Sequence, residues 1–184
     1  MIILLSGSSG SGKNTVINAL KSEENSVFTS FPSYTTREKR PGEKDGDLYV
    51  YVTAEEFAEK IMAGDLYEYQ PVHGELYGTS RKLVDAAMQK SKYVIKDIDV
   101  KGMVNLKREL SFRYHVVSVF LYVGKEELKK RLIGRGEKPE SIEHRMLRYE
   151  EELADADKFD YRIDNVILEE TLARIKEIAE KESV

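Results

Sequence analysis

The stretch IILLSGSSGSGKNT, residues 2–15, decides how this sequence folds. Its apolar run from Ile2 to Leu5 is uninterrupted, which is typical of a parallel strand covered on both faces. Glycine and serine then replace apolar residues from Gly7 to Gly12, and a segment compatible with a helix follows. The order of strand, glycine-rich loop and helix predicts the first unit of an α/β domain.

The loop has the spacing of a phosphate-binding loop, with glycines at its two ends and a lysine after the second. Such a loop directs successive N–H groups at phosphate oxygens, the helix N-terminus adds partial positive charge, and the lysine reaches the β- and γ-phosphates. A glycine-rich turn with a surface lysine is the simpler alternative, but it leaves the spacing and the strand-helix context unexplained. We expect the nucleotide phosphates to be bound by one continuous segment: Gly7, Ser8, Ser9, Gly10, Ser11, Gly12, Lys13, Asn14 and Thr15.

One position departs from the phosphate-loop pattern. Asn14 stands where a Ser or Thr hydroxyl ordinarily helps to hold Mg²⁺, and Thr15 follows it. Adenylate kinases are similar in placing a Thr one residue later. An Asn carbonyl can ligate a hard cation, although its reach is longer. Both residues are therefore candidates on the metal side.

Composition narrows the class of protein. A chain of 184 residues fits one compact domain, and its net charge of -4 comes from interspersed charges of both signs, without a basic face for nucleic acid. The lack of Cys excludes disulfides and thiolate metal sites. The opening apolar run is too short for a signal peptide or a membrane span. We expect a soluble, cytoplasmic protein without a membrane partner; the oligomeric state is not indicated.

Further elements follow the same alternation. Apolar runs at Tyr93 to Ile95 and Val116 to Val123 each precede a segment compatible with a helix, beginning near Val100 and Lys125. This alternation predicts a parallel sheet with crossover helices. Two later segments carry core-facing stripes at helical spacing: Ile142, Met146, Tyr149 and Leu153, then Leu168, Leu172, Ile175 and Ile178.

Residues 33–80 interrupt this alternation with turns, short aromatic-rich strands and a helix that starts at Thr53. Glu56 lies three residues later, which matches a capping box. The segment has too few large apolar residues to form a core alone. We interpret it as an insertion at the rim of the main sheet.

Several blocks of sequence together resemble one family. They read SYTTREKRPGE (residues 33–43), DGDLY (45–49), DLYEY (65–69), HGELYGTS (73–80), DIDVKG (97–102) and RLIGRG (131–136). In these blocks the chain resembles the guanylate kinases. The blocks occur in the same order as in that family, and the resemblance extends over the whole chain. The resemblance implies transfer of the γ-phosphoryl group of ATP to GMP, giving ADP and GDP, with Mg²⁺ as cofactor.

The resemblance also implies an architecture. It is an α/β fold with a P-loop NTPase-like parallel sheet core flanked by helices, formed by residues 1–32, 81–130 and 157–184. A GMP-binding subdomain is inserted at about 33–80, and a helical lid occupies about 131–156.

The acceptor side carries the residues that a dianionic phosphate needs. Arg37 and Arg40 offer forked, permanently charged donors, and Tyr49 and Tyr77 offer hydroxyls. The alternative for such an arginine pair is a solvated face. The turn-rich context and the two tyrosines favour phosphate binding.

Glu68 suits guanine, whose N1–H and exocyclic amine lie side by side and can both donate to one carboxylate. Adenine presents an acceptor at N1 instead, so a buried carboxylate disfavours it. The resemblance implies that the hydroxyls of Ser33 and Thr79 also contact the base and that Asp99 is a further base-side carboxylate. Taken alone, without the neighbouring blocks, Glu68 would be interpreted as an exposed charge on an edge strand.

The resemblance assigns a metal role, through water, to Asp97. Capping of the following helix is the alternative for an Asp at the end of a strand. Lys96 and Lys101 occupy positions where the family more often has an apolar residue and Gln.

The resemblance assigns lid positions to Arg131, Arg135 and Arg145, where closure brings positive charge over the ATP phosphates. Asn165 matches an Asn near the adenine pocket of the family, with Val166 and Ile167 in place of the usual acidic residues. Arg148 is interpreted as a surface cation.

Three histidines, His73, His115 and His144, show no metal-ligand spacing and receive no catalytic role. Two alternatives to the kinase remain open from the sequence. One is a catalytically impaired guanylate-kinase-like binding module, for which Asn14 is the main support. The other is a related P-loop kinase for another small phosphate acceptor, which should lack a guanine-reading set.

Overall fold

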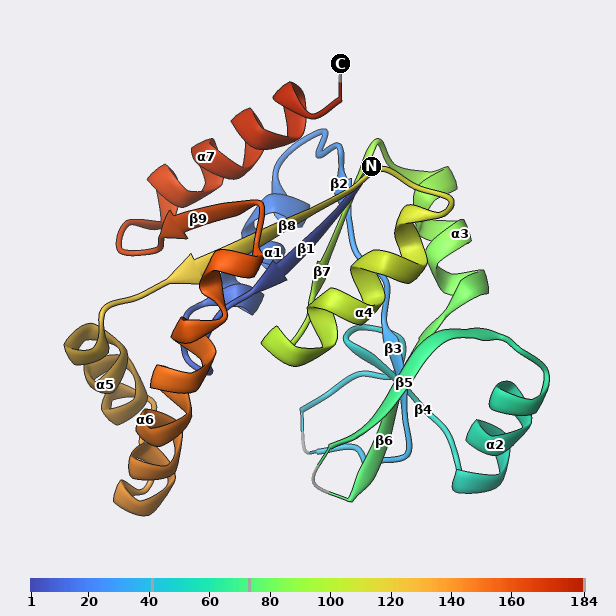
Figure 1. Cartoon of the computed structure of the whole chain (residues 1–184), viewed down its shortest axis with the longest axis horizontal. Helices are drawn as coiled ribbons and strands as arrows, with labels where there is room; N and C mark the ends of the chain where they lie inside the picture. Colours follow the sequence, from blue (N-terminus) through green and yellow to red (C-terminus); the bar gives the residue numbers. More distant parts are fainter. Residues whose placement is uncertain (41, 73, 184) are drawn as a thin grey trace.

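The computed structural model describes residues 1–40, 42–72 and 74–183. Within them, a main sheet of parallel strands has the order β2-β7-β1-β8-β9, with β1 at its centre (Figure 1). The predicted parallel sheet is therefore confirmed. Its strands are β1 (Ile2–Ser6), β2 (Phe28–Thr29), β7 (Tyr93–Asp97), β8 (Val116–Tyr122) and β9 (Tyr161–Asp164).

Helices cover both faces of this sheet. Successive residues of β1 point to opposite faces. Ile2 and Leu4 pack in the core beneath α3 (Arg81–Lys90) and α4 (Val100–Ser111). Their neighbours on β1 pack in the core beneath α1 (Lys13–Ser22) and α7 (Leu168–Lys181). Because both faces are buried, the strand needs the continuous apolar run seen in the sequence.

A second, smaller sheet has the order β4-β3-β6-β5 and lies beside α3 and α4 (Figure 1). The Thr53 side chain accepts from the Glu56 N–H, and Glu56 accepts from the Thr53 N–H, so the predicted capping box is present on α2 (Ala54–Met62). Phe57 of this helix is fully buried over Gly78. The strands are β3 (Ser33–Thr35), β4 (Tyr49–Tyr51), β5 (Leu66–Val72) and β6 (Glu75–Ser80).

Helices α5 (Lys125–Gly134) and α6 (Pro139–Ala154) form an arm that follows β8, and a short 3-10 helix (Ala156–Lys158) leads back to β9 (Figure 1). Ile142 and Tyr149 of α6 are buried in a small core between the two helices. The apolar stripes predicted for α6 and α7 are confirmed, since their members are buried or partly buried.

One boundary expected from the sequence was wrong. Strand β7 does not end at Ile95 but continues through Lys96 to Asp97, which pair with Leu4 and Leu5 of β1. Backbone pairing is indifferent to side-chain polarity, so the ladder extends past the apolar run. No helix within the described residues combines the length and apolar character needed to cross a membrane.

Candidate active site

The phosphate loop joins β1 to α1. Gly7, Gly10 and Gly12 have positive φ angles of 141°, 96° and 96°. Residues other than glycine rarely adopt such backbone angles. A Cβ atom on Gly7 would lie 2.5 Å from the Leu121 carbonyl oxygen, so only glycine lets the loop approach β8 this closely. The Lys13 amino group donates to the carbonyl oxygens of Gly7 (2.5 Å) and Ser8 (3.2 Å). The Lys13 side chain therefore folds back onto the phosphate loop and bonds to two of its carbonyl oxygens.

The pKa of the Lys13 amine is influenced by burial and by several charged residues. Burial lowers the pKa of the Lys13 amine, while Asp97, Glu152 and Asp99 act in the opposite direction, and Arg135 adds to the lowering. The carboxyl end of β7 lies beside the end of β1 that leads into the phosphate loop, since Asp97 pairs with Leu5 and the Ile98 N–H donates to the Leu5 carbonyl oxygen at 3.0 Å; this is where a parallel sheet binds ligands.

On the acceptor side, Arg37 is held by Glu43. One guanidinium nitrogen, Nη2, donates to both Glu43 carboxylate oxygens at 2.8 and 3.0 Å, and the Tyr51 hydroxyl donates to Oε2 at 2.8 Å. The hydrogen bond from Arg37, followed by those from the Arg40 N–H and Tyr51, lowers the pKa of Glu43 to about 2. A carboxylate here makes the type of contact that a phosphate makes with arginine.

Tyr49 and Tyr77 lie beside this arginine. Their ring centroids are 5.7 Å apart, and the Arg37 Cζ is 5.3 Å from the Tyr49 centroid. Burial, and next the charge of Asp97, raises the pKa of Tyr49 to about 12. The structure thus brings Arg37 and both tyrosines together, whereas the Arg40 side chain is exposed.

The base-side residues lie on β3, β5 and β6. The buried Thr79 hydroxyl donates to Glu68 Oε1 at 2.7 Å, and Ser33 is half-buried on β3 of the same sheet. Burial raises the pKa of Glu68, the hydrogen bond from Thr79 opposes this, Asp99 adds to the rise, and Lys96 opposes it. Glu68 is therefore a desolvated carboxylate with one donor already in place.

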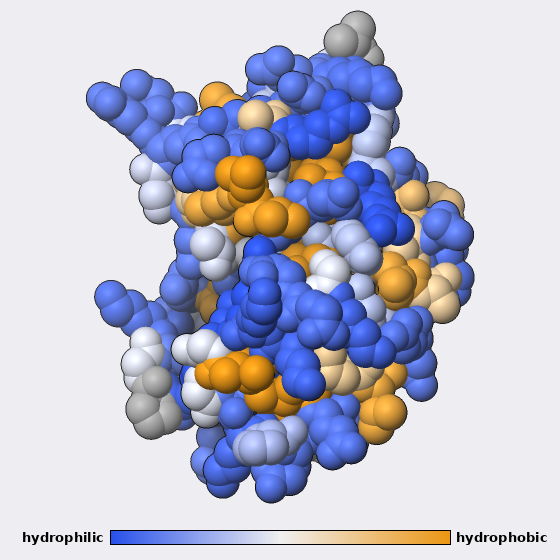
Figure 2. All heavy atoms as spheres, turned by 90° about the vertical axis from the view of Figure 1, so that its left-hand side faces the viewer, coloured by the Kyte–Doolittle hydropathy of each residue, from blue (hydrophilic) through white to orange (hydrophobic). Residues whose placement is uncertain are grey.

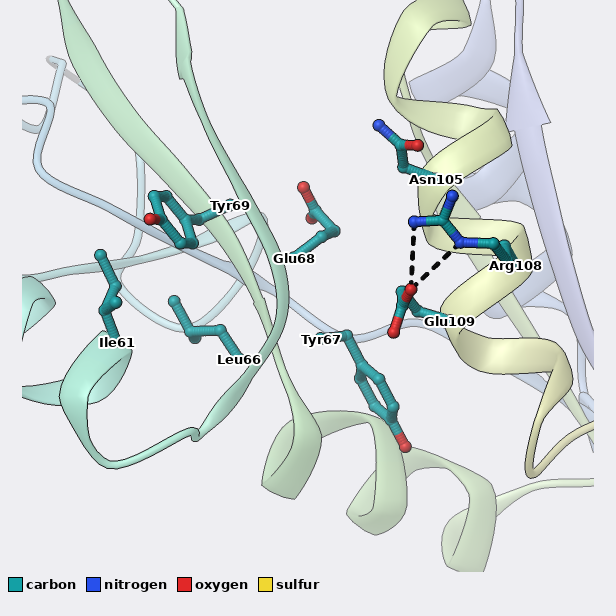
Figure 3. A pocket seen from close by; sticks show the side chains of 8 residues that line it. All are labelled: Ile61, Leu66, Tyr67, Glu68, Tyr69, Asn105, Arg108 and Glu109. Atoms are coloured by element: carbon teal, nitrogen blue, oxygen red, sulfur yellow. Dashed lines mark hydrogen bonds and ion pairs between the residues drawn. The ribbon is translucent and has the colours of Figure 1, made fainter.

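A cavity of about 320 Å³ opens beside Glu68, between β5 and α4. Figure 3 shows Glu68 projecting from its strand toward α4, where Asn105 and Arg108 face it. Arg108 pairs with its neighbour Glu109 at 3.2 Å. The cavity leaves room next to the carboxylate that the sequence assigns to guanine. It is lined by Ile61, Leu66, Tyr67, Glu68, Tyr69, Asn105, Arg108 and Glu109.

Asp99 has two structural partners. Its Oδ1 accepts from the Gly102 N–H at 2.9 Å as the N-cap of α4, and its Oδ2 accepts from Gln70 Nε2 at 2.5 Å. The capping alternative considered for Asp97 applies to Asp99 instead, because Asp97 is the last residue of β7.

The metal-side candidates are all oxygen donors. Asn14 and Thr15 are exposed in the first turn of α1, and Asp97 is half-buried. Amide, hydroxyl and carboxylate oxygens are the ligands that Mg²⁺ prefers, so this donor set fits the ion. Lys96 adds an unexpected charge: it is 4% exposed, with its Nζ 3.4 Å from Asp97 Oδ1 and 5.4 Å from the Phe31 ring centroid.

The lid arginines differ in their placement. Arg131, in the last turn of α5, contacts Glu127 at 3.0 Å and donates to the Asn165 carbonyl oxygen at 2.9 Å. Arg145 of α6 donates to the Ser9 hydroxyl of the phosphate loop and pairs with Glu137 at 2.7 Å. Arg145 therefore contacts the phosphate loop directly, and Arg131 contacts Asn165, whose side chain donates to the Ser11 carbonyl oxygen of that loop.

The third lid arginine, Arg135, is exposed just beyond α5. The surface interpretation of Arg148 agrees with the 51% exposure of its side chain, which pairs at 3.5 Å with the less exposed Glu152. Among the histidines, His115 contacts Glu182 and His144 is exposed, while His73 and Pro41 lie outside the described residues.

Sequence reasoning missed four residues around this site. The sequence prediction assigns no role to Glu43, although a carboxylate six residues after Arg37 is a usable signal. Lys96 departs from the family pattern, and this departure alone does not indicate a role. Gln70 and Thr171, which contact Asp99 and Asn165, had no signal in the sequence.

Comparison with known proteins identifies the family. The family model described as guanylate kinase matches residues 1–182. The chain belongs to the guanylate kinase family. It is 38% identical over 181 residues to the guanylate kinase of Corynebacterium jeikeium (strain K411), covering 96% of this chain and 94% of that relative. It is 37% identical over 186 residues to that of Thermotoga maritima, covering 98% and 86%.

A solved structure agrees with the sequence relatives. The crystal structure of guanylate kinase from Anaplasma phagocytophilum superimposes with a TM-score of 0.75 at 31% identity, over 99% of this chain and 85% of that one. The predicted α/β fold and guanylate kinase function are confirmed, and the alternative of a binding module is not favoured.

Proposed function

We propose that this guanylate kinase transfers the γ-phosphoryl group of ATP to GMP where the carboxyl end of β7 meets the phosphate loop and the acceptor sheet. One observation carries the proposal. The segment at the carboxyl end of β7 contacts both parts of the site: the Ile98 N–H donates to the Leu5 carbonyl oxygen at 3.0 Å, close to the phosphate loop, and Asp99 accepts from Gln70 of the acceptor sheet at 2.5 Å. These contacts support a donor site and an acceptor site on either side of residues 97–99.

On the donor side, the N–H groups of the loop bind the phosphate chain. Lys13 exchanges its bonds to the Gly7 and Ser8 carbonyl oxygens for bonds to the β- and γ-phosphates. The donor set comprises Gly7, Ser8, Ser9, Gly10, Ser11, Gly12, Lys13, Asn14, Thr15 and Asn165.

On the acceptor side, the GMP phosphate takes the place of Glu43 at Arg37. Tyr49 and Tyr77 add hydroxyl donors, and Arg40 reaches the phosphate from its exposed position. Glu68, with its donor Thr79, accepts the two adjacent N–H groups of guanine. Ser33 and Asp99 complete the base-side set.

The transfer step depends on alignment and on neutralisation of charge. Arg131, Arg135 and Arg145 place positive charge around the transferring group. Asn14, Thr15 and Asp97 would hold Mg²⁺, which when bound neutralises charge on the phosphates.

For this reaction the molecule has three functional parts. They are a core of residues 1–32, 81–130 and 157–184, an acceptor unit of about 33–80 and a lid of about 131–156. The cytoplasmic location and the lack of a nucleic-acid partner stay predictions.

A panel of nucleoside monophosphates tests the activity, with MgATP as donor and ADP release as the readout. We expect GMP to be phosphorylated in preference to AMP, CMP and UMP, and Lys13→Ala to abolish transfer. Equal or better turnover of another monophosphate would contradict the assignment. Glu68→Gln should raise the KM for GMP by about tenfold with little change in the KM for ATP, because one paired acceptor is lost.

A further inference from the structure

Asn165 lies in the turn between β9 and α7, and its side chain is 5% exposed. Nδ2 donates to the Ser11 carbonyl oxygen of the phosphate loop at 2.6 Å. Oδ1 accepts from the Thr171 hydroxyl, in the first turns of α7, at 2.8 Å. The Ser11 carbonyl can only accept, so the orientation of the carboxamide is fixed by its partners.

The backbone of Asn165 joins two further elements. Its N–H donates to the Tyr122 carbonyl oxygen at the end of β8, at 2.8 Å, and its own carbonyl oxygen accepts from Arg131 Nη2 at 2.9 Å. One buried residue thus connects the phosphate loop, β8, α5 and α7.

The Asn165 side chain packs closely against the phosphate loop. Gly12 has a φ of +96°, and a Cβ atom there would lie 2.7 Å from Asn165 Nδ2. The carboxamide is therefore packed against the residue that immediately precedes Lys13. A change in its length, charge or position must move the loop backbone or Arg131.

The side chains of the two residues that follow cannot form hydrogen bonds with a base. Val166 and Ile167 are 66% and 48% exposed, and their side chains carry no polar atom. Figure 2 shows that one face of the molecule has several hydrophobic patches among hydrophilic residues. The polar atoms of Asn165 point inward, toward the loop and α7.

We propose that Asn165, held by Thr171, is a positioning residue that sets the phosphate loop and Arg131 for the triphosphate of the donor, independently of the donor base. This inference rests on the proposed function, since it concerns the donor of that reaction. It predicts that disturbing Asn165 weakens the binding of every triphosphate equally, with or without a base.

The experiment compares binding of MgATP, MgCTP and inorganic tripolyphosphate with Mg²⁺ by calorimetry. Asn165→Asp places a carboxylate against the Ser11 carbonyl oxygen, so we expect about a tenfold or greater loss of affinity for all three probes. Thr171→Val keeps the shape and removes the orienting hydroxyl, and we expect about a threefold loss, again for all three. The KM for GMP should not change in either variant, as it would if the acceptor sheet were disturbed.

Asn18→Asp is the matched control, because Asn18 is exposed on α1 and receives the same change of charge. It should bind all three probes like the wild type. Thermal unfolding checks that each variant is folded; if Asn165→Asp is not, Thr171→Val decides.

Loss of affinity for ATP alone would overturn the inference and assign Asn165 to the base. Unchanged affinity for all probes would overturn it as well. A wild-type chain that binds tripolyphosphate but does not phosphorylate GMP would contradict the proposed function and leave the loop assignment testable by the same variants.

Discussion

Lys96 places a positive charge in the interior, between the donor and acceptor parts of the site. A buried ammonium group is costly unless it is paired. Lys96 is paired with Asp97, lies near the face of Phe31 and opposes the rise in the pKa of Glu68. Its charge therefore acts on two carboxylates, Asp97 on the proposed metal side and Glu68 on the proposed base side.

Replacing Lys96 by Met keeps the length of the side chain and removes its charge. The pKa of Glu68, already raised by burial, should rise further, so more of this carboxyl group is protonated and unable to accept two hydrogens. The ionised form is lost as pH falls, so the KM for GMP should increase most at low pH, by up to about tenfold, and approach the wild-type value as pH rises.

KM measured between about pH 5.5 and 8.5 checks this dependence. Lys101→Met, at an exposed position, is the control and should behave like the wild type. A Lys96→Met variant with the wild-type KM at every pH would exclude an electrostatic role for this lysine.

At this scale the sequence predicted the residues whose chemistry is visible in isolation. Arg37, Tyr49 and Tyr77 could be grouped from their types and order, and the structure brings them together. The spacing of Glu43 from Arg37 was a usable signal, but Lys96 could not be given a role, because charge compensation depends on which side chains become neighbours after folding. Phe31 and Glu68, which interact with Lys96, lie in distant segments of the chain.

Among the elements, α2 shows how a local signal fixes one end of a helix. Thr53→Ala removes the side-chain acceptor for the Glu56 N–H, so the free energy of unfolding should fall by about 1 kcal/mol. Chemical denaturation measures this change, and hydrogen exchange should show faster opening of the first turn of α2. Glu59→Gln, exposed on the same helix, should change stability by less than about 0.5 kcal/mol. An equal effect of both substitutions would contradict the cap assignment.

The three central strands of the main sheet, β1, β7 and β8, were predictable because each contains a continuous apolar run. The pairing within the smaller sheet was not predictable: β3 and β4 have only three residues each, too few for a periodic pattern, and they pair in parallel across a long turn. The length of strand β7 was underestimated, because its last two residues are charged but still pair with β1.

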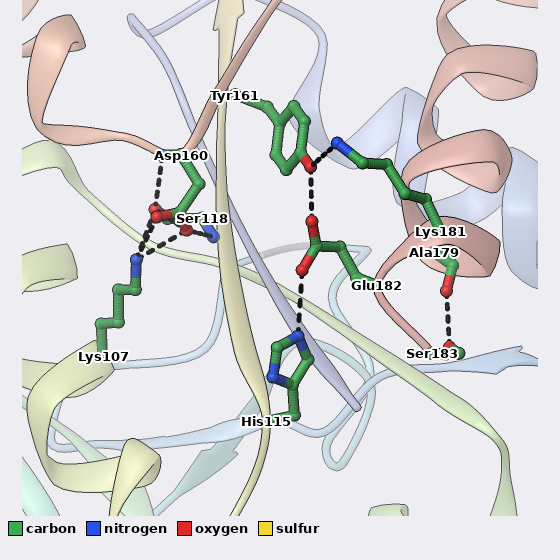
Figure 4. Close-up of polar contacts among 9 residues, drawn as sticks. All are labelled: Lys107, His115, Ser118, Asp160, Tyr161, Ala179, Lys181, Glu182 and Ser183. Atoms are coloured by element: carbon green, nitrogen blue, oxygen red, sulfur yellow. Dashed lines mark hydrogen bonds and ion pairs between the residues drawn. The ribbon is translucent and has the colours of Figure 1, made fainter.

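On the scale of the whole molecule, polar contacts join elements that are far apart in the sequence. Figure 4 shows Lys107 of α4 and Ser118 of β8 meeting Asp160, which precedes β9. Lys107 Nζ lies 2.6 Å from each Asp160 carboxylate oxygen, and the Ser118 N–H and hydroxyl donate at 2.7 and 2.8 Å. This carboxylate therefore fastens an edge strand of the main sheet to its interior.

Asp160→Asn should make stability depend less on pH. Burial acts to raise the pKa of Asp160, but hydrogen bonds from Lys107 and Ser118 hold it below its ordinary value of 3.8. The contribution of a carboxylate with a lowered pKa is present above the ordinary value and is lost as pH falls through the folded-state value. The variant should melt at a lower temperature than the wild type at pH 7, with a difference that shrinks below about pH 4.

Melting temperatures from about pH 3 to 7 test this, with exposed Asp157→Asn as the control. A difference between wild type and Asp160→Asn that stayed constant over the whole range would assign the effect to packing alone. The sequence predicted neither this network nor the position of the smaller sheet beside α3 and α4, since both depend on contacts between distant segments.

The closed phosphate loop also affects the reactivity of its lysine. Burial lowers the pKa of Lys13, so at a given pH more of this amine is neutral, and a neutral amine is a nucleophile. Phosphates that replace the Gly7 and Ser8 carbonyl oxygens favour the protonated form instead. Acylation of Lys13 should therefore be faster in the nucleotide-free protein than with a donor triphosphate bound, so its modification rate would report whether the proposed donor site is occupied.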